Sequence, residues 1–140
     1  MLIEKITYQN KELFETFVYN IPLFIQEITD AQNFDKDIQV CIDKYTTGYE
    51  NLEIRKKLDQ LRIPSPKDFI TFHGKDSFLG FSVSLNKRIA IKFDKHHTNT
   101  IYKVTVEKGD LMLILFKYSK VYIEYEIYLG LKPKSLKYNS

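Results

Sequence analysis

The pattern of apolar residues changes at Pro64 and Pro66, and this change constrains the fold more than any other feature of the sequence. Before the prolines, apolar side chains return at the spacing of an amphipathic helix, as in residues 13–18 and 54–61. After them come short segments rich in Ile, Val, Phe and Tyr, separated by Gly, Asp, Asn and Lys. We therefore expect strands at residues 69–72, 80–85, 101–106, 111–116 and 121–129.

Helices followed by strands are typical of an α+β domain. We expect a helical part at residues 1–62, with three or four short helices, and a β core at residues 63–134. A chain of 140 residues buries one continuous core, so the prediction is a single domain over residues 1–140.

Composition narrows the class of protein. Hydrophobic residues make up 44% and charged residues 28%, which is typical of a globular chain and too apolar for a disordered one. The longest apolar run, Leu111 to Phe116, is far too short to span a bilayer, and Glu4 lies where a signal peptide would be basic and then apolar. We expect a cytoplasmic protein without a membrane partner.

The net charge of +3 is unevenly divided, because the first 62 residues are net acidic and the remainder is net basic. A phosphate-bearing small molecule would suit the basic half, and a solvated basic surface explains the same asymmetry. The sequence lacks the clustered basic stripe that is typical of nucleic-acid binding, so we do not expect nucleic acid as a partner. The single cysteine, Cys41, has no second thiol for a disulfide or a metal site.

Glu124 and Glu126 are the most suggestive pair of residues. On a strand, residues two apart point to the same face, so both carboxylates would share one side. This face could simply be solvated. Alternatively, two close carboxylates can stabilise positive charge at a sugar carbon and take a proton from an incoming nucleophile.

Ser82 and Ser84 have the same spacing, and a strand with a polar outer face explains them as well as a catalytic role does. A hydroxyl could also hold a neighbouring carboxylate in one orientation. His73 and Gly74 end the preceding predicted strand, where they could form an ordinary turn or hold a ligand. The sequence contains no glycine-rich phosphate loop, no His-Glu-x-x-His and no Gly-x-Ser-x-Gly, so hydride transfer and serine hydrolysis have no support.

In order along the chain, these segments resemble the ADP-ribosyltransferase toxins of the arginine-serine-glutamate class. The likeness runs from about Ile42 to Lys134. The matching segments are a helical lead-in at 42–55, a strand at 64–74 where the family ends in aromatic-Arg-Gly, the aromatic-Ser-x-Ser strand at 80–85, an Ala-x-x-Phe segment at 90–93, a strand ending in Lys-Gly at 104–109, and a Glu-x-Glu strand at 124–129.

The chain departs from the class at His73, which occupies the place of the NAD-binding arginine, at Val83, which replaces the middle threonine, and in the short connection between His73 and Ser82. His-Gly at this strand end is similar to the branch of diphtheria toxin and the poly(ADP-ribose) polymerases, in which histidine contacts the adenosine ribose. The chain therefore resembles a hybrid of the two branches.

The resemblance implies an ADP-ribosyltransferase-like fold in which N-terminal helices cap a mostly antiparallel β core of two packed sheets, with NAD as the substrate and no metal. It implies that Glu126 stabilises the transition state, that Ser82 orients Glu126, and that Glu124 serves the acceptor, an arginine of a target protein. The residues expected to contact NAD are His73, Gly74, Phe81, Ser84 and Phe93, and those expected to contact the target are Tyr118, Ser119 and Tyr122.

The function implied is transfer of ADP-ribose from NAD to a protein side chain, with release of nicotinamide. Such an enzyme would suit a toxin-like effector in a prokaryotic cytoplasm, for instance a phage-encoded modifier of proteins in the host cell. Two alternatives stay open. One is a catalytically inactive protein of the same fold that blocks a partner surface, and the other is the RNA 2'-phosphotransferase branch, whose arginine and histidine motifs are not visible.

Overall fold

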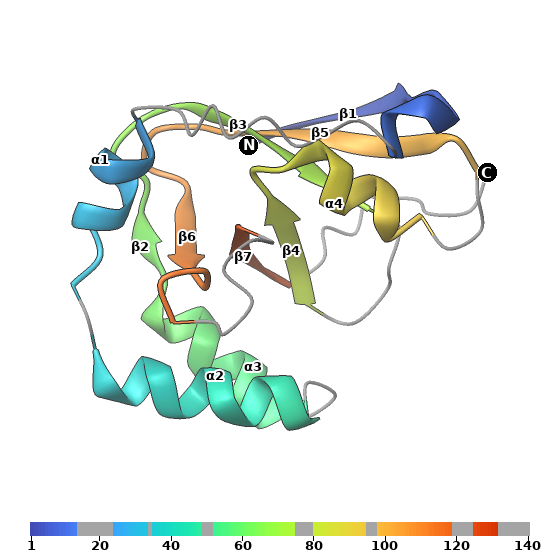
Figure 1. The fold of residues 1–140 in the computed structure, drawn as a ribbon. Coiled ribbons are helices and arrows are strands. Elements are labelled where there is room, and N and C mark those ends of the chain that lie inside the picture. The colour runs from blue at the N-terminus through green and yellow to red at the C-terminus, as the bar shows by residue number, and fades with distance from the viewer. Residues whose placement is uncertain are drawn as a thin grey trace.

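The computed structural model is a mixed α+β structure built on one sheet (Figure 1). It describes residues 1–13, 24–33, 35–48, 52–74, 80–94, 98–118 and 125–131. These residues form the strands β1 (Leu2–Thr7), β2 (Ile63–Pro64), β3 (Phe69–His73), β4 (Gly80–Ser84), β5 (Thr100–Val106), β6 (Leu111–Ile114) and β7 (Glu126–Leu131). They also form the helices α1 (Phe24–Asp30), α2 (Lys36–Gly48), α3 (Leu52–Leu61) and α4 (Lys87–Lys92) and the short 3-10 helix η1 (Asn10–Leu13).

The strands lie in the order β1-β5-β3-β4-β7-β6-β2, and every neighbouring pair is antiparallel. The order brings β4 beside β7, although more than forty residues separate them in the sequence. β1 and β2 are the two edges. The expected α+β class and the antiparallel pairing are confirmed, but the strands form a single sheet where two packed sheets were expected.

The sheet bends so that one of its faces encloses the largest core. Side chains from β4, β5, β6 and β7, such as Val83, Val104, Ile114 and Ile127, pack in one cluster, and Ile28 of α1 joins them. In Figure 1, β2 and β6 run across the direction of β1 and β5, which allows the two halves to share this core. We call this side of the sheet the inner face and the opposite side the outer face.

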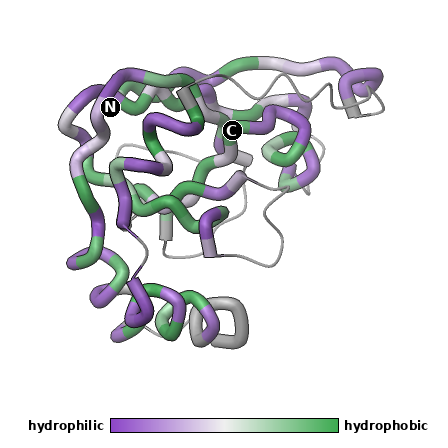
Figure 2. Tube along the Cα trace, turned by 60° about the vertical axis from the view of Figure 1, so that its left-hand side comes forward, coloured by the Kyte–Doolittle hydropathy of each residue, from purple (hydrophilic) through white to green (hydrophobic). Residues whose placement is uncertain are grey.

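The helices α2, α3 and α4 cover the outer face in two separate places. Leu58 of α3 packs with Leu113 and Tyr128 over β6 and β7. Ala90 of α4 packs with Ile101 over the other half of the sheet. In Figure 2 the chain of α2 and α3 alternates between hydrophilic and hydrophobic residues, as the spacing of a half-buried helix requires. In the described part of the chain, no helix is long and apolar enough to cross a membrane.

The sequence predicted α2 and α3 and the positions of most strands correctly. It was wrong about the first residues, because the chain opens with β1 and not with a helix. β1 pairs with β5 over six residues, from Leu2 opposite Thr105 to Thr7 opposite Thr100. The sequence-based prediction also missed α4, which lies inside the predicted β core. Residues 14–23, which include most of the first predicted helical stretch, and residues 121–124 of the last predicted strand lie outside the described residues.

The side chain of Gln32 bonds to the backbone of β6. Its amide nitrogen donates to the carbonyl oxygen of Ile114 at 3.1 Å, and its amide oxygen accepts from the backbone nitrogen of Ile114 at 2.8 Å. The side chain thus pairs with β6 as a neighbouring strand would. Lys117 in turn donates to the carbonyl oxygens of Thr29 and Gln32, which supports the end of α1.

We expect Gln32→Ala to lower the free energy of unfolding by about 2–4 kcal/mol, because it leaves the buried N–H and C=O of Ile114 without partners. Urea denaturation would measure the change. Gln26→Ala is the matched control, since Gln26 is exposed on α1 and its side chain donates to Asp30, which is also exposed, one turn away. Its effect should stay within about 0.5 kcal/mol. Equal losses in the two variants would contradict the role assigned to Gln32.

Candidate functional site

The three strands that carry the predicted site are consecutive in the sheet. His73 ends β3, Ser82 and Ser84 lie on β4, and Glu126 begins β7. The order β3-β4-β7 therefore brings together segments that are widely spaced in the sequence (Figure 1). In adjacent antiparallel strands, the Cβ atoms of directly opposite residues are about 5 Å apart.

Strand register places Ser82, Ser84 and Glu126 on the outer face. Ser84 lies directly opposite Glu126, and Ser82 lies opposite Tyr128. Directly opposite residues share a face, and so do residues two apart along a strand. Tyr128 packs under α2 and α3, which fixes this face as the outer one. We call Ser82, Ser84 and Glu126 the polar strip, and it lies between the area covered by α4 and the area covered by α2 and α3.

The Ser82 hydroxyl makes no hydrogen bond within the described structure. Its Oγ is buried, and among the described residues it has no hydrogen-bond partner. In particular, the expected hydrogen bond from Ser82 to Glu126 is not formed. Buried polar groups nearly always find partners in folded proteins, so an exception requires an explanation such as strain, a ligand or a catalytic role.

Ser84 uses its hydroxyl to start α4. The Oγ accepts a hydrogen bond from the backbone nitrogen of Asn86 at 2.9 Å, and the side chain of Asn86 accepts one from the backbone nitrogen of Arg88 at 3.0 Å. Asn86 is therefore the N-cap of the helix. The sequence contains the signal for this cap, an Asn just before the helix, although it was not used to predict α4.

Glu126 is half-buried, and its backbone is held on both sides. Its carbonyl oxygen accepts from the backbone nitrogens of Leu115 and Phe116 at 3.0 and 3.1 Å. Tyr125, immediately before it, has a φ of 44°, which is uncommon for a residue with a large side chain. The ring of Tyr125 packs edge-on against Phe116, and its carbonyl oxygen accepts from Leu85. These contacts fix the point from which the Glu126 side chain leaves the sheet.

His73 points to the other side of the sheet. Phe72 lies opposite Ser84 and shares its outer face, so the next residue, His73, faces inward. Its ring centroid is 4.4 Å from that of Phe81 and 6.3 Å from that of Tyr102, and the residue is only 5% exposed. Its Nδ1 lies 2.6 Å from the carbonyl oxygen of Ser82.

Two other residues expected to contact NAD are part of the packing. Phe81 is fully buried in the inner core. Gly74 is buried against the end of α4, where an added Cβ would lie 2.7 Å from the Cβ of Phe93 and closer still to the carbonyl oxygen of Ala90. Glycine is therefore required here by the helix, whatever a ligand would need. Phe93 itself, at the end of α4, is partly exposed.

The residues expected to contact a protein target have a different placement. Tyr118 is buried in the core under α2 and α3. Its hydroxyl donates to the carbonyl oxygen of Asn33 and accepts from the backbone nitrogen of Asp35, both at 3.1 Å. Tyr118 therefore fixes the loop before α2. Ser119, Tyr122 and the predicted catalytic residue Glu124 lie outside the described residues.

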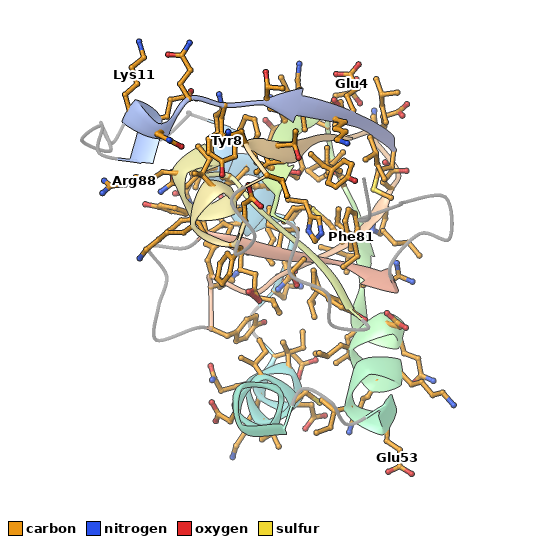
Figure 3. The ribbon with its side chains drawn as sticks, turned by 90° about the vertical axis from the view of Figure 1, so that its right-hand side faces the viewer. Glu4, Tyr8, Lys11, Glu53, Phe81 and Arg88 are labelled. Carbon is orange, nitrogen blue, oxygen red and sulfur yellow. The ribbon has the colours of Figure 1, made fainter. Side chains whose placement is uncertain are left out.

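A buried polar network holds the end of α4 against the sheet. The Tyr8 hydroxyl donates to the carboxylate of Asp94 at 2.6 Å, and Thr98 donates to the same carboxylate at 3.0 Å. Figure 3 shows Tyr8 between β1 and α4. At the other end of α4, Lys87 forms an ion pair with Glu12 at 2.8 Å, and this contact lowers the pKa of Glu12. No local pattern could have revealed Tyr8 and Asp94, because they are 86 residues apart.

Two tyrosines of this region have raised pKa values. Burial, together with the hydrogen bond to Asp94, raises the pKa of Tyr8 to about 12. Burial alone raises the pKa of Tyr102, which lies beside His73. Within the described ranges, no three His, Cys, Asp or Glu residues are grouped closely enough to hold a metal ion.

The raised pKa of Tyr8 predicts a pH dependence of stability. A group whose pKa is higher in the folded than in the unfolded chain stabilises the fold below the unfolded value and loses this effect as the pH rises through the folded value. The contribution of Tyr8 should therefore be complete below pH 10.0 and lost toward about pH 12. Tyr8→Phe should be less stable than wild type by about 1–3 kcal/mol near neutral pH. The gap, measured by urea denaturation, should narrow over that window, and a gap that stays constant would contradict the assignment.

Comparison with known proteins does not add a relative. No protein-family model matches the chain, and neither a curated protein nor a solved structure matches it. What the polar strip can do therefore follows from the chemistry of its own residues.

Proposed function

We propose that the protein is a mono-ADP-ribosyltransferase that moves ADP-ribose from NAD to a side chain of a protein target, arginine by the family likeness, and releases nicotinamide. The bent sheet would be its ADP-ribosyltransferase-like β core. The neighbouring positions of β3, β4 and β7 support the proposal, because three of the six segments of the family resemblance, 64–74, 80–85 and 124–129, overlap these three strands.

The observation that carries the proposal is the unpartnered hydroxyl of Ser82 on the face of the sheet that also carries Glu126. Ser82 and Glu126 share the polar strip, and the Ser82 Oγ is buried without a hydrogen bond to any described residue. A buried hydroxyl in this state costs about 1–3 kcal/mol. A ligand that bonds to Ser82 would remove this cost.

The chemistry of the proposed reaction explains why a fixed carboxylate is needed. As nicotinamide leaves, positive charge develops on the ribosyl carbon. A carboxylate held close to this carbon stabilises the transition state more than the ground state, and its fixed position avoids reorganisation during the reaction. Glu126 fits this role, since the hydrogen bonds to its carbonyl oxygen and the contacts of Tyr125 fix its backbone. In the proposal, Glu124 aligns the acceptor and takes its proton.

The proposal extends to the setting of the enzyme. Its expected place is the cytoplasm of a prokaryote, where an effector of this kind, for instance one encoded by a phage, would modify host proteins. NAD would be a substrate consumed in each turnover and not a resident cofactor.

A second candidate function is a binding module that has kept the fold without the catalysis. Three observations favour it. His73 faces the inner core, the end of α4 occupies the space beside Gly74, and the Ser84 hydroxyl accepts a hydrogen bond at the start of that helix. In this candidate the surface around the polar strip would block a partner protein. NAD turnover separates the two candidates, because only the enzyme shows it.

We expect Glu126→Gln to reduce NAD hydrolysis and transfer by about 100-fold or more, because the change keeps size and hydrogen bonding but removes the negative charge. Labelled NAD incubated with the protein and a cell extract would report both activities, and calorimetry should show NAD binding nearly unchanged. Glu53→Gln is the matched control, because Glu53 is exposed and points outward from α3 (Figure 3). Undiminished turnover in Glu126→Gln would remove this residue from the mechanism.

We also expect Ser82→Ala to lower turnover by roughly tenfold while leaving the free energy of unfolding unchanged or higher, because it removes a buried hydroxyl that has no partner. Ser84→Ala is its counterpart. It should cost about 1 kcal/mol of stability, since it removes the acceptor for Asn86. Full activity in Ser82→Ala would mean that its hydroxyl does not meet the substrate.

A further inference from the structure

The imidazole of His73 links β3 to β4 where the strand pairing between them is weak. In the described residues, β3 and β4 share one cross-strand pair, Phe72 opposite Ser84, whereas β3 and β5 share five. The pairing of β4 with β7 also shifts register between Gly80 and Ser82. The backbone ladder is thus least regular at Ser82, and there the His73 Nδ1 lies 2.6 Å from the Ser82 carbonyl oxygen.

The chemistry of this contact fixes the state of the ring. A carbonyl oxygen can only accept a hydrogen bond, so Nδ1 must carry the proton that it donates. Phe81 and Tyr102 pack around the ring, and His73 is only 5% exposed. A ring enclosed in this way keeps one orientation, and its hydrogen bond restrains the peptide group of Ser82.

The restraint reaches the outer face of the sheet through the backbone. The direction of a Cα–Cβ bond follows from the orientation of the flanking peptide groups. Holding the Ser82 carbonyl from the inner side therefore sets the Cα–Cβ direction from which the Ser82 Oγ extends on the outer face. On the next strand, Glu126 shares this face.

We propose that His73 is a positioning residue that acts through the main chain of Ser82 and sets the position of the Ser82 side chain on the face that it shares with Glu126, without contacting the nucleotide itself. Its catalytic consequence rests on the proposed function. Its structural content, a protonated Nδ1 bonded to the Ser82 carbonyl, does not.

The kinetic test compares three replacements of His73. The amide nitrogen of Asn can occupy the place of the histidine Nδ1, and the amide nitrogen of Gln can occupy the place of Nε2. Leu has no hydrogen-bond donor. His73→Leu should lower kcat for NAD hydrolysis by about tenfold or more and change KM for NAD less than about twofold. His73→Asn should recover most of the lost kcat, and His73→Gln should not.

A different pattern would overturn the proposal. If His73 held the ribose of NAD directly, KM would rise about tenfold or more in the Leu and Asn variants alike, with kcat largely kept. If the role were only packing, the Leu variant would lose stability with no loss of kcat below its unfolding temperature.

A spectroscopic test does not depend on activity. Long-range ¹H–¹⁵N correlation of the wild-type protein distinguishes the two ring nitrogens of each of its three histidines. We expect the Nδ1 of His73 to be protonated. The His73 signal is assigned as the one that disappears in His73→Asn. An unprotonated Nδ1 would refute the hydrogen bond to the Ser82 carbonyl.

The two tests separate the failure of this inference from the failure of the proposed function. If the wild-type protein turns over no NAD, the proposed function fails, but the tautomer still decides the inference. The thermal stability of the variants gives a second reading, because a lost hydrogen bond makes His73→Leu melt below His73→Asn despite the greater hydrophobicity of leucine. The reverse order of melting would contradict the link.

Discussion

The pairing of β4 with β7 is the interaction on which the rest of the structure depends. It joins β1, β5 and β3 on one side to β6 and β2 on the other. Because the sheet bends, apolar residues of both halves, such as Val83 and Ile127, enter one inner core. The same pairing leaves the alternate residues, Ser84 and Glu126, opposite each other on the outer face. A core and a polar strip thus follow from one set of backbone hydrogen bonds.

The outer face shows how the structure deals with this polar strip. α4 covers one part of the face with apolar contacts, and α2 and α3 cover another. Between them, Ser84 turns its hydroxyl to the start of α4, whereas the Ser82 hydroxyl stays buried without a described partner. A sequence selected only for stability would replace Ser82 by alanine or another small apolar residue. Its presence is the reason to place chemistry here and not elsewhere on the sheet.

Local patterns predicted the parts of this fold that depend on local physics. The spacing of Ile54, Leu58 and Leu61 predicted α3, and the β-branched and aromatic runs predicted the central strands. β1 escaped prediction because Glu4 and Lys5 interrupt its apolar pattern, so that its pairing with β5 decides its conformation. Contacts such as Tyr8 with Asp94 join distant positions, and no short-range rule reports them.

The faces on which the candidate residues lie were only partly predictable. Spacing alone placed Ser82 with Ser84 on one side of a strand, and the register of β4 with β7 places Glu126 on the same side. The face of His73 could not be predicted, because a shift of one residue in register would move every side chain of β3 to the opposite side. The burial of Tyr118 could not be predicted either, because its hydroxyl bonds to Asp35 and Asn33, which lie 83 and 85 residues earlier in the sequence.

The environment of His73 also explains why the chain departs from the arginine of the family that it resembles. The position lies on the inner face, against Phe81 and Tyr102, with 5% of the residue exposed. A guanidinium is always charged, and burying it against two aromatic rings costs several kcal/mol unless a carboxylate pairs with it, on the order of the whole stability margin of a small domain. An imidazole fits the same space and can donate one hydrogen bond to the Ser82 carbonyl. Histidine is therefore compatible with this position on the inner face, whereas an arginine here would need a buried partner for its charge.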